Sequence, residues 1–226
     1  MTRIGKNAEL LSSGYQGVVY KVPAGPEFPD VDYLIIKQAM GSALLRWFRR
    51  RMIRREHEIY RLLNGIRGIP RCFGLEDDCL ILEYIDSQPL KLSKNTLQER
   101  EHFFSSLLVL LQATHAAGVA HADLKRKENI LVGPGEAPYL IDFGSAVICS
   151  HTSGAFRRWL FRQFCQIDLN AWCKHKYLGR YDEISAADLP LYRATFVERL
   201  IRPLRRAWRT VTARQWRKAR KHRKKL

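Results

Sequence analysis

The chain has 226 residues, of which 46% are apolar and 27% are charged, and its formal net charge is +17. This length and composition fit one well-buried domain or two small lobes, and they argue against a chain that is disordered throughout. Residues 193–226 hold 14 Lys and Arg against one acid, so the rest of the chain is only about +4. Such a basic tail indicates an anionic partner, with a solvated, partly disordered end as the alternative.

The cysteines and the N-terminal residues bear on the compartment. Five cysteines are odd in number, widely spaced and never arranged as C-x-x-C, which indicates reduced thiols rather than disulfides or a zinc site. His115 and His121 lack a Cys or His at ligand spacing, so we expect them to form hydrogen bonds. No signal-peptide core and no run of ~20 apolar residues is found. We expect a cytoplasmic protein, soluble or peripheral to a membrane.

The first part of the chain predicts five strands and one helix. Around Gly14 and Gly17, small and β-branched side chains alternate, which indicates a strand, a glycine turn and a second strand. Residues at helical spacing predict a helix over Met40–Asn64, ended by Gly65. The strands are expected within Leu10–Val22 and at Tyr33–Lys37, Arg71–Leu75 and Cys79–Ile85. Together they predict an N-terminal lobe over residues 1–85.

The polar segment Asp86–Lys94 contains Pro89 and predicts a hinge to a second lobe over residues 86–192. This lobe begins with a strong helix at Leu97–Ala117. Two short strands, Ile130–Val132 and Tyr139–Asp142, follow it, and the chain beyond Gly144 is expected to be helical but short. Residues 193–226 form the basic tail.

The glycine turn is suited to cover phosphates. Gly14 and Gly17 allow close approach of the backbone, whose N–H groups then meet the anion. Val19 lies 18 residues before a strand lysine, a position from which its side chain could pack on one face of an adenine ring. The alternative is an ordinary β-hairpin that carries two glycines.

Lys37 ends an apolar strand, where a lysine is costly unless its ammonium has partners. A pair of phosphates and a carboxylate would serve. We expect Glu56 to supply that carboxylate, because it lies one turn before buried positions of the helix. Glu58 is the second candidate, and a surface ion pair is the alternative for either glutamate.

The segments H-A-D-L-K and D-F-G predict phosphoryl transfer. Asp123 follows a helix and is placed to accept the proton of an acceptor hydroxyl, while Lys125 is placed to reach the γ-phosphoryl group. Asn129 and Asp142 offer oxygen ligands of the kind that Mg²⁺ prefers. The order and spacing of these residues indicate an enzyme that uses ATP and Mg²⁺.

Over about Leu10 to Val147 these motifs resemble the protein-kinase superfamily. The resemblance implies an α+β, bilobal kinase-like fold with a five-stranded antiparallel N-lobe, one inserted helix and an abbreviated, mostly helical C-lobe. It also implies that ATP binds between the lobes, with backbone groups near Glu83 and Ile85 at the adenine. Lys37, Glu56, Asp123, Asn129 and Asp142 occupy the positions of the strand lysine, its helix glutamate, the catalytic aspartate and the two metal ligands.

The chain departs from the usual kinase pattern in four places. Ser12 replaces the first loop glycine, Ala122 replaces the arginine of H-R-D, and one extra residue separates Asp123 from Asn129. No A-P-E motif follows Gly144, and the 82 residues after it are too few for a full peptide-docking lobe. These features, together with Asp168–Tyr177 and the basic tail, resemble small bacterial RIO-type kinases and lipopolysaccharide core (Kdo/heptose) kinases.

Two stretches mix aromatic rings with arginines. Ala155–Phe164, laid on a helix, has an aromatic face beside a cationic one, and Arg46 with Arg49–Arg51 surround Trp47 and Phe48. Such faces suit a membrane headgroup region. The alternative, which we weigh equally for Trp159 and Phe164, is that the rings pack under the short C-lobe.

Three functions remain open. The leading hypothesis is a bacterial cytoplasmic kinase that phosphorylates a hydroxyl of an envelope glycolipid or sugar at the inner membrane face. The second is a RIO-like serine/threonine protein kinase. The third is a pseudokinase-like module whose tail binds membrane or nucleic acid, although Lys37, Asp123 and Asp142 would then have no chemical purpose.

Overall fold

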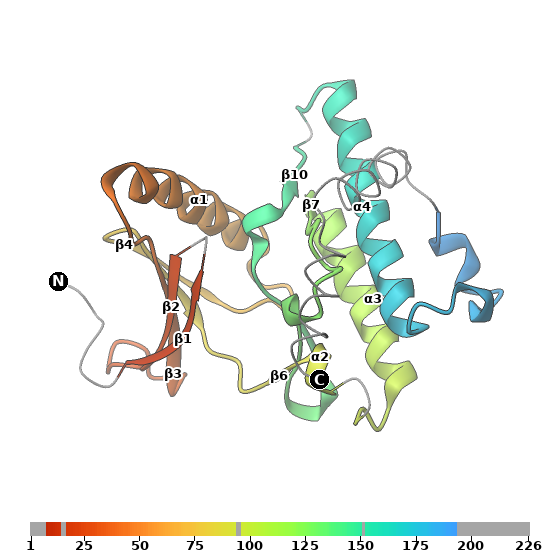
Figure 1. Cartoon of the computed structure of the whole chain (residues 1–226), viewed down its shortest axis with the longest axis horizontal. Coiled ribbons are helices and arrows are strands. Elements are labelled where there is room, and N and C mark those ends of the chain that lie inside the picture. The colour runs from red at the N-terminus through yellow and green to blue at the C-terminus, as the bar shows by residue number, and fades with distance from the viewer. Residues whose placement is uncertain (1–7, 15–16, 94–95, 151, 194–226) are drawn as a thin grey trace, which may run out of the picture.

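The computed structural model describes residues 8–14, 17–93, 96–150 and 152–193. Within these ranges the chain forms two lobes, a twisted sheet crossed by one long helix and a mostly helical part beside it (Figure 1). The proposed boundaries at residues 85 and 192 stay predictions. The basic tail from residue 194 onward lies outside the described residues.

The first lobe contains a five-stranded antiparallel sheet with the strand order β1-β2-β3-β5-β4. The strands are β1 (Glu9–Gly14), β2 (Gly17–Pro23), β3 (Tyr33–Gln38), β4 (Cys72–Glu76) and β5 (Cys79–Glu83). The predicted antiparallel lobe with one inserted helix is therefore confirmed. A Cβ on Gly17 would collide with the Gln38 carbonyl, and the φ of Gly17 is +138°. The local backbone therefore requires glycine here whether or not a nucleotide binds.

The central strands β3 and β5 of this sheet are buried on both faces. Leu34 and Ile36 point to one face and pack with Val22, Cys79 and Ile81 in a small cluster. The intervening Ile35, with Leu80 and Leu82 of β5, joins the main core beneath helix α1. A strand buried on both faces has a continuous apolar sequence, as Leu34 to Ile36 does. The lysine that ends this run is consequently held at the buried inner face.

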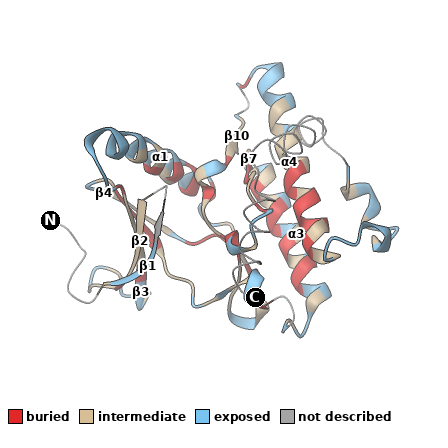
Figure 2. Ribbon diagram, viewed as in Figure 1, coloured by how far each residue is buried: buried red, intermediate tan, exposed pale blue. Residues whose placement is uncertain are grey.

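Helix α1 (Ala43–Leu62) is buried over only its second half. Ile53, Glu56, Ile59 and Tyr60 are buried, whereas the preceding turns are largely exposed. Figure 2 shows the same division, with the buried residues of α1 on the half nearer the second lobe. The helix is therefore fixed at one end, which carries Glu56, and extends from the molecule at the other.

The segment expected to be a bare hinge is partly ordered as secondary structure. It contains β6 (Gln88–Pro89), which pairs with β8, and the short helix α2 (Leu90–Ser93). Leu90 is buried in the main core. This pairing attaches the segment to the second lobe, so the free connection between lobes is shorter than the sequence indicates.

The second lobe is built on two packed helices, α3 (Arg100–Ala116) and α4 (Ala155–Lys176). Trp172 of α4 is buried against α3 and donates its indole N–H to the Phe104 carbonyl at 2.8 Å. Between the helices lie β7 (Val119–Ala120), η1 (Lys127–Asn129), β8 (Ile130–Val132), η2 (Pro134–Glu136), β9 (Pro138–Leu140), η3 (Phe143–Ser145) and β10 (Val147–Ile148). Two short 3-10 helices follow α4: η4 (Tyr181–Glu183) and η5 (Leu189–Leu191), where η denotes a 3-10 helix throughout.

The helix after the D-F-G segment differs from expectation. A short helical region was predicted, but α4 has 22 residues and its second half is central to the core. Arginines in its first half obscure the apolar pattern that continues beyond them. Among the described residues, no helix is both long enough and apolar enough to span a bilayer.

Candidate active site

Lys37 lies on β3, directly opposite Val19 of β2 and Leu80 of β5. Its ammonium nitrogen is 2.8 Å from both carboxylate oxygens of Glu56 on α1. The same nitrogen is 3.2 Å from Oδ1 of Asp142, which is 105 residues away in the chain. The fold therefore joins a strand, a helix and the D-F-G segment at one ammonium group.

Burial and the two neighbouring carboxylates together determine the charge state of Lys37. Burial alone would lower the pKa of Lys37, but the carboxylates of Glu56 and Asp142 outweigh it, so its pKa is raised and the lysine stays charged. Burial raises the pKa of Glu56, and the Lys37 ammonium opposes that rise. Removing Lys37 would leave Glu56 buried without a cation, whereas removing Glu56 would leave Lys37 with Asp142 as its remaining carboxylate. Glu58, the second candidate for this partner, is exposed.

Asp142 has left-handed backbone geometry, with φ of +63°. The adjacent Phe143 is fully buried, with its ring 5.3 Å from Tyr60 of α1 and 4.7 Å from His121, measured between centroids. Burial raises the pKa of Tyr60 well above its usual value. The phenylalanine anchors the segment in the core, and the turn in the backbone then directs the Asp142 carboxylate toward Lys37.

Asp123 and Asn129 are in contact despite the extra residue between them. The Asn129 amide donates to the Asp123 carbonyl at 3.1 Å and lies 3.3 Å from its carboxylate Oδ2. Asn129 is only 4% exposed and is the last residue of η1, just before β8. Arg126 is 3.7 Å from the same carboxylate oxygen. Lys125 is on the exposed side of this loop.

Ile141 connects these two groups of residues. Its backbone N–H donates to the Asn129 carbonyl at 3.1 Å, and its own carbonyl is 2.9 Å from Nε2 of His121. Because Asp142 is the next residue, the loop that carries Asp123 and the segment that carries Asp142 are fixed to each other. His121 and His115 both form hydrogen bonds, as expected.

The structure describes only part of the segments that were expected to contact adenine and the phosphates. Gly14 and Gly17 pair across the β1–β2 turn, whose two central residues lie outside the described part. Glu83 uses its backbone N–H for the Arg71 carbonyl and its carboxylate for the Arg71 N–H. The Ile85 carbonyl accepts the hydroxyl of Ser87 at 2.9 Å. The Glu83 side chain thus has a structural partner, and an adenine contact there would use only remaining backbone groups.

Sequence reasoning missed the part played by Asp168 on α4. It is fully buried, and its carboxylate accepts the backbone N–H groups of His121 at 2.7 Å and Ala122 at 2.9 Å, with His115 at 3.2 Å. Ala122 has φ of +66°, a strained value for alanine, and its bond to Asp168 holds it there. One signal in the sequence could have revealed the role of Asp168. Its carboxylate follows Ile167 on a side of the helix that is otherwise apolar.

His175 holds the other side of the same loop. Its Nε2 is 2.7 Å from the Leu124 carbonyl, and burial lowers its pKa to about 4, so the ring stays neutral and donates at pH 7. Asp168 and His175 are two turns apart on α4 and bind the backbone on either side of Asp123. Helix α4 therefore positions Asp123 without touching its carboxylate.

The available donors fit Mg²⁺ shared with a nucleotide. Mg²⁺ is usually held by one or two protein oxygens together with phosphates, and Asp142 and Asn129 offer such oxygens. Within the described residues, no cluster of three or more His, Cys, Asp or Glu could hold a metal alone. Lys37 adds a cation beside Asp142, where phosphates would need one.

No curated protein matches this chain. The family model of the RIO domain matches residues 37–165, which is more than half of the chain. The match begins at Lys37 and includes Glu56, Asp123, Asn129 and Asp142, while the glycine turn lies before it and Asp168 just beyond it. The chain therefore belongs to the RIO family, within the protein-kinase-like superfamily.

Proposed function

We propose that this protein is an ATP- and Mg²⁺-dependent kinase that transfers the γ-phosphoryl group to a hydroxyl acceptor. One observation carries the proposal. The Lys37 ammonium lies between Glu56 and Asp142, and Ile141 connects this group to the Asp123–Asn129 pair. Burying charges is costly to a fold, so a buried cation between two carboxylates favours a role in binding the phosphates of a nucleotide.

The roles of the residues follow from their positions. Lys37 would bind nucleotide phosphates, with Glu56 holding the ammonium in place. Asp142 and Asn129 would bind Mg²⁺, which supplies charge neutralisation at the transferring group. Gly14, Gly17 and Val19 would cover the nucleotide from β1 and β2, and backbone groups near Glu83 and Ile85 would meet adenine.

Asp123 would act as the base. As the acceptor oxygen bonds to the γ-phosphorus and the bond to the ADP oxygen breaks, the hydroxyl proton passes to the Asp123 carboxylate. Its contact with the Asn129 amide fixes the direction of this carboxylate. Lys125, on the exposed side of the loop, would stabilise charge on the transferring group.

Two acceptor classes are supported by different observations. A serine or threonine hydroxyl of a protein is favoured by the RIO family match, since RIO kinases are atypical protein kinases. A hydroxyl of an envelope glycolipid or sugar, at the cytoplasmic face of a bacterial inner membrane, is favoured by the lack of an A-P-E motif and by exposed aromatic and arginine side chains. The family match supports the protein acceptor, so we rank it first, which reverses the order that the sequence indicated.

Labelled-phosphate transfer separates these alternatives. The full chain is incubated with γ-labelled ATP and Mg²⁺, once with soluble cell protein and once with a membrane lipid extract. We expect label in one fraction with the native chain and none with Asp123→Asn. Unchanged transfer by Asp123→Asn would remove Asp123 from its assigned role.

Nucleotide binding is measured separately by thermal denaturation. ATP with Mg²⁺ should raise the melting temperature of the native chain and of Asp123→Asn, but not of Asp142→Ala. Stabilisation by ATP without transfer to either fraction would identify a pseudokinase-like binding module. No stabilisation of the native chain would contradict the proposal as a whole.

A further inference from the structure

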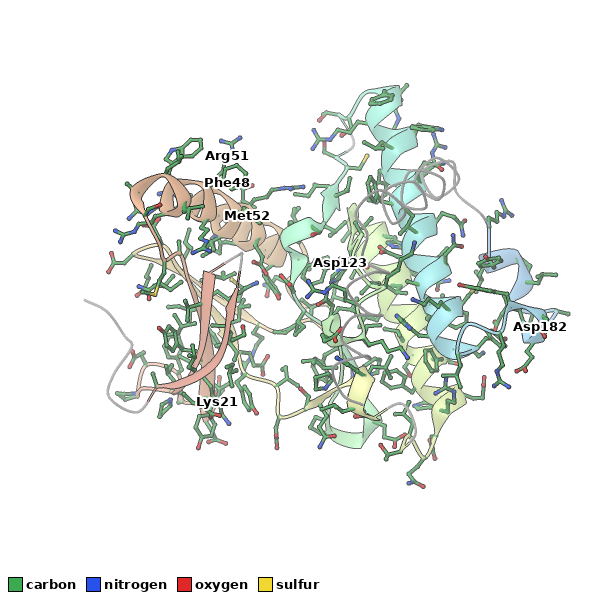
Figure 3. All side chains as sticks on the ribbon, in the orientation of Figure 1. Lys21, Phe48, Arg51, Met52, Asp123 and Asp182 are labelled. Atoms are coloured by element: carbon green, nitrogen blue, oxygen red, sulfur yellow. The ribbon has the colours of Figure 1, made fainter. Side chains whose placement is uncertain are left out.

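The first three turns of α1 present apolar side chains to solvent. Leu44 is 79% exposed, Trp47 61% and Phe48 51%. They lie at helical spacing of three and four residues, so they form one continuous strip on the helix surface. Figure 3 shows Phe48 on the side of α1 that faces away from the sheet. An exposed strip of this kind marks an interaction site.

The same turns of α1 are strongly cationic. Residues 43–55 contain six arginines and no acid. Arg50 and Arg54 pair with Asp78 of the β4–β5 turn. Arg46 and Arg51 make no ion pair within the described part of the chain, so their charges face solvent beside the apolar strip.

The first turns of α4 repeat this arrangement. Phe156 is 74% exposed and stacks on Trp159, with the ring centroids 5.9 Å apart and the planes inclined by 25°. Three arginines follow within seven residues, and residues 152–167 contain no acid. In Figure 1 the first turns of α1 and of α4 both lie at the upper edge of the molecule, one from each lobe.

From this we infer that the first turns of α1 and α4 together form a docking surface for an anionic lipid bilayer. Aromatic and aliphatic side chains would enter the headgroup region, while neighbouring arginines would meet lipid phosphates. The charge complementarity selects this partner. The composition of residues 193–226, with 14 Lys and Arg, makes them a less favourable partner for arginines than an anionic bilayer.

Nucleic acid fits the surface less well. Arginines and aromatic rings would suit phosphates and bases, but the exposed aliphatic Leu44 and Leu45 would gain nothing from a nucleic acid. A bilayer uses all three kinds of side chain. The inference concerns binding rather than transfer, so it can fail or succeed independently of the proposed kinase activity.

The test uses fluorescence of Trp47, because the tail alone would bring the protein to anionic vesicles. In the full chain, Trp159, Trp208 and Trp216 are replaced by Phe, which leaves Trp47 and the buried Trp172. Vesicles are made of equal parts phosphatidylglycerol and phosphatidylcholine, with or without bromine on the acyl chains. We expect brominated lipid to quench Trp47. The same chain with Trp47→Phe supplies the background from Trp172.

A second variant measures the apolar contribution. Leu44→Ser, Trp47→Ser and Phe48→Ser in the otherwise native chain should weaken vesicle binding at high salt by at least roughly tenfold, because salt screens the tail but not apolar contact. Leu92→Ser with Val109→Ser is the matched control, since these side chains are 67% and 66% exposed elsewhere. The control should bind as the native chain does.

Three results would overturn the inference. The first is vesicle binding without quenching of Trp47, which would assign binding to the tail alone. The second is no binding to anionic vesicles. The third is quenching of Trp47 by a single-stranded RNA of about twenty nucleotides but not by brominated lipid, which would assign the surface to nucleic acid.

Discussion

The carboxylate of Asp168 accepts the backbone N–H of His121 at 2.7 Å, although 47 residues separate them in the chain. A second oxygen of the same carboxylate accepts the N–H of Ala122. The backbone of the H-A-D segment is thus fixed by hydrogen bonds to α4, a helix that follows the D-F-G segment in the chain. This relationship places Asp123 and explains why α4 is needed in a chain with a short second lobe.

Asp168→Asn should destabilise the protein by roughly 2–4 kcal/mol, because one acceptor oxygen becomes an amide donor facing a backbone N–H. Urea denaturation measures this change. Asp182→Asn is the control, since Asp182 is an exposed carboxylate (Figure 3) and should change stability little. An equal effect of both variants would contradict the assigned role.

The same variant should separate positioning from binding. Asp168→Asn leaves Lys37 and Asp142 in place, so ATP with Mg²⁺ should still raise its melting temperature. Its kcat should fall at least roughly tenfold while the KM for ATP changes little, because the loop holding Asp123 loses an anchor. A fall in kcat no larger than that of Asp182→Asn would show that Asp168 serves the fold alone.

Lys37→Met should abolish transfer and also destabilise the fold by roughly 3 kcal/mol at pH 8, because Glu56 is left buried without its cation. Adding Glu56→Gln should restore most of the stability but none of the activity. Denaturation and labelled transfer measure the two effects on the same samples. Failure of the double variant to regain stability would show that Lys37 acts through packing rather than charge.

The pH dependence of Lys37→Met provides a further check. Burial raises the pKa of Glu56, and removing Lys37 removes the main opposing cause. The folded variant then binds a proton more tightly than the unfolded chain does. Its stability should fall as the pH rises from about 4.5, by at most about 1.4 kcal/mol per pH unit. Lys37→Met/Glu56→Gln should lack this added slope.

His175 should make the native chain sensitive to acid. Its pKa is lowered from 6.5 to about 4 by burial, so the unfolded chain binds a proton first as the pH falls. The stabilisation is complete above pH 6.5 and is lost between about pH 6.5 and 4, up to roughly 3 kcal/mol. His175→Gln keeps a donor near the Leu124 carbonyl and should flatten this part of the stability curve. An unchanged slope would contradict the assignment.

The sequence alone predicted the N-terminal sheet, and it singled out Glu56 and Asp142, which the structure brings beside Lys37. Alternating and continuous apolar runs define β1 to β5, and a lysine at the end of a buried strand requires partners whatever the fold. The preference for Glu56 over Glu58 followed from helical periodicity, since one position lies on the buried side and the other does not. The proposed roles of these residues in binding and catalysis stay predictions.

Other features depended on contacts between distant segments. The length of α4, the pairing of β6 with β8 and the anchoring of the loop that carries Asp123 by Asp168 and His175 could not be inferred from local patterns. A buried carboxylate and an exposed one have the same letter in a sequence, and only tertiary packing removes water from one of them. The sequence therefore determined which chemical groups this protein has. The tertiary structure decided which of them are shielded from water and close enough to act together.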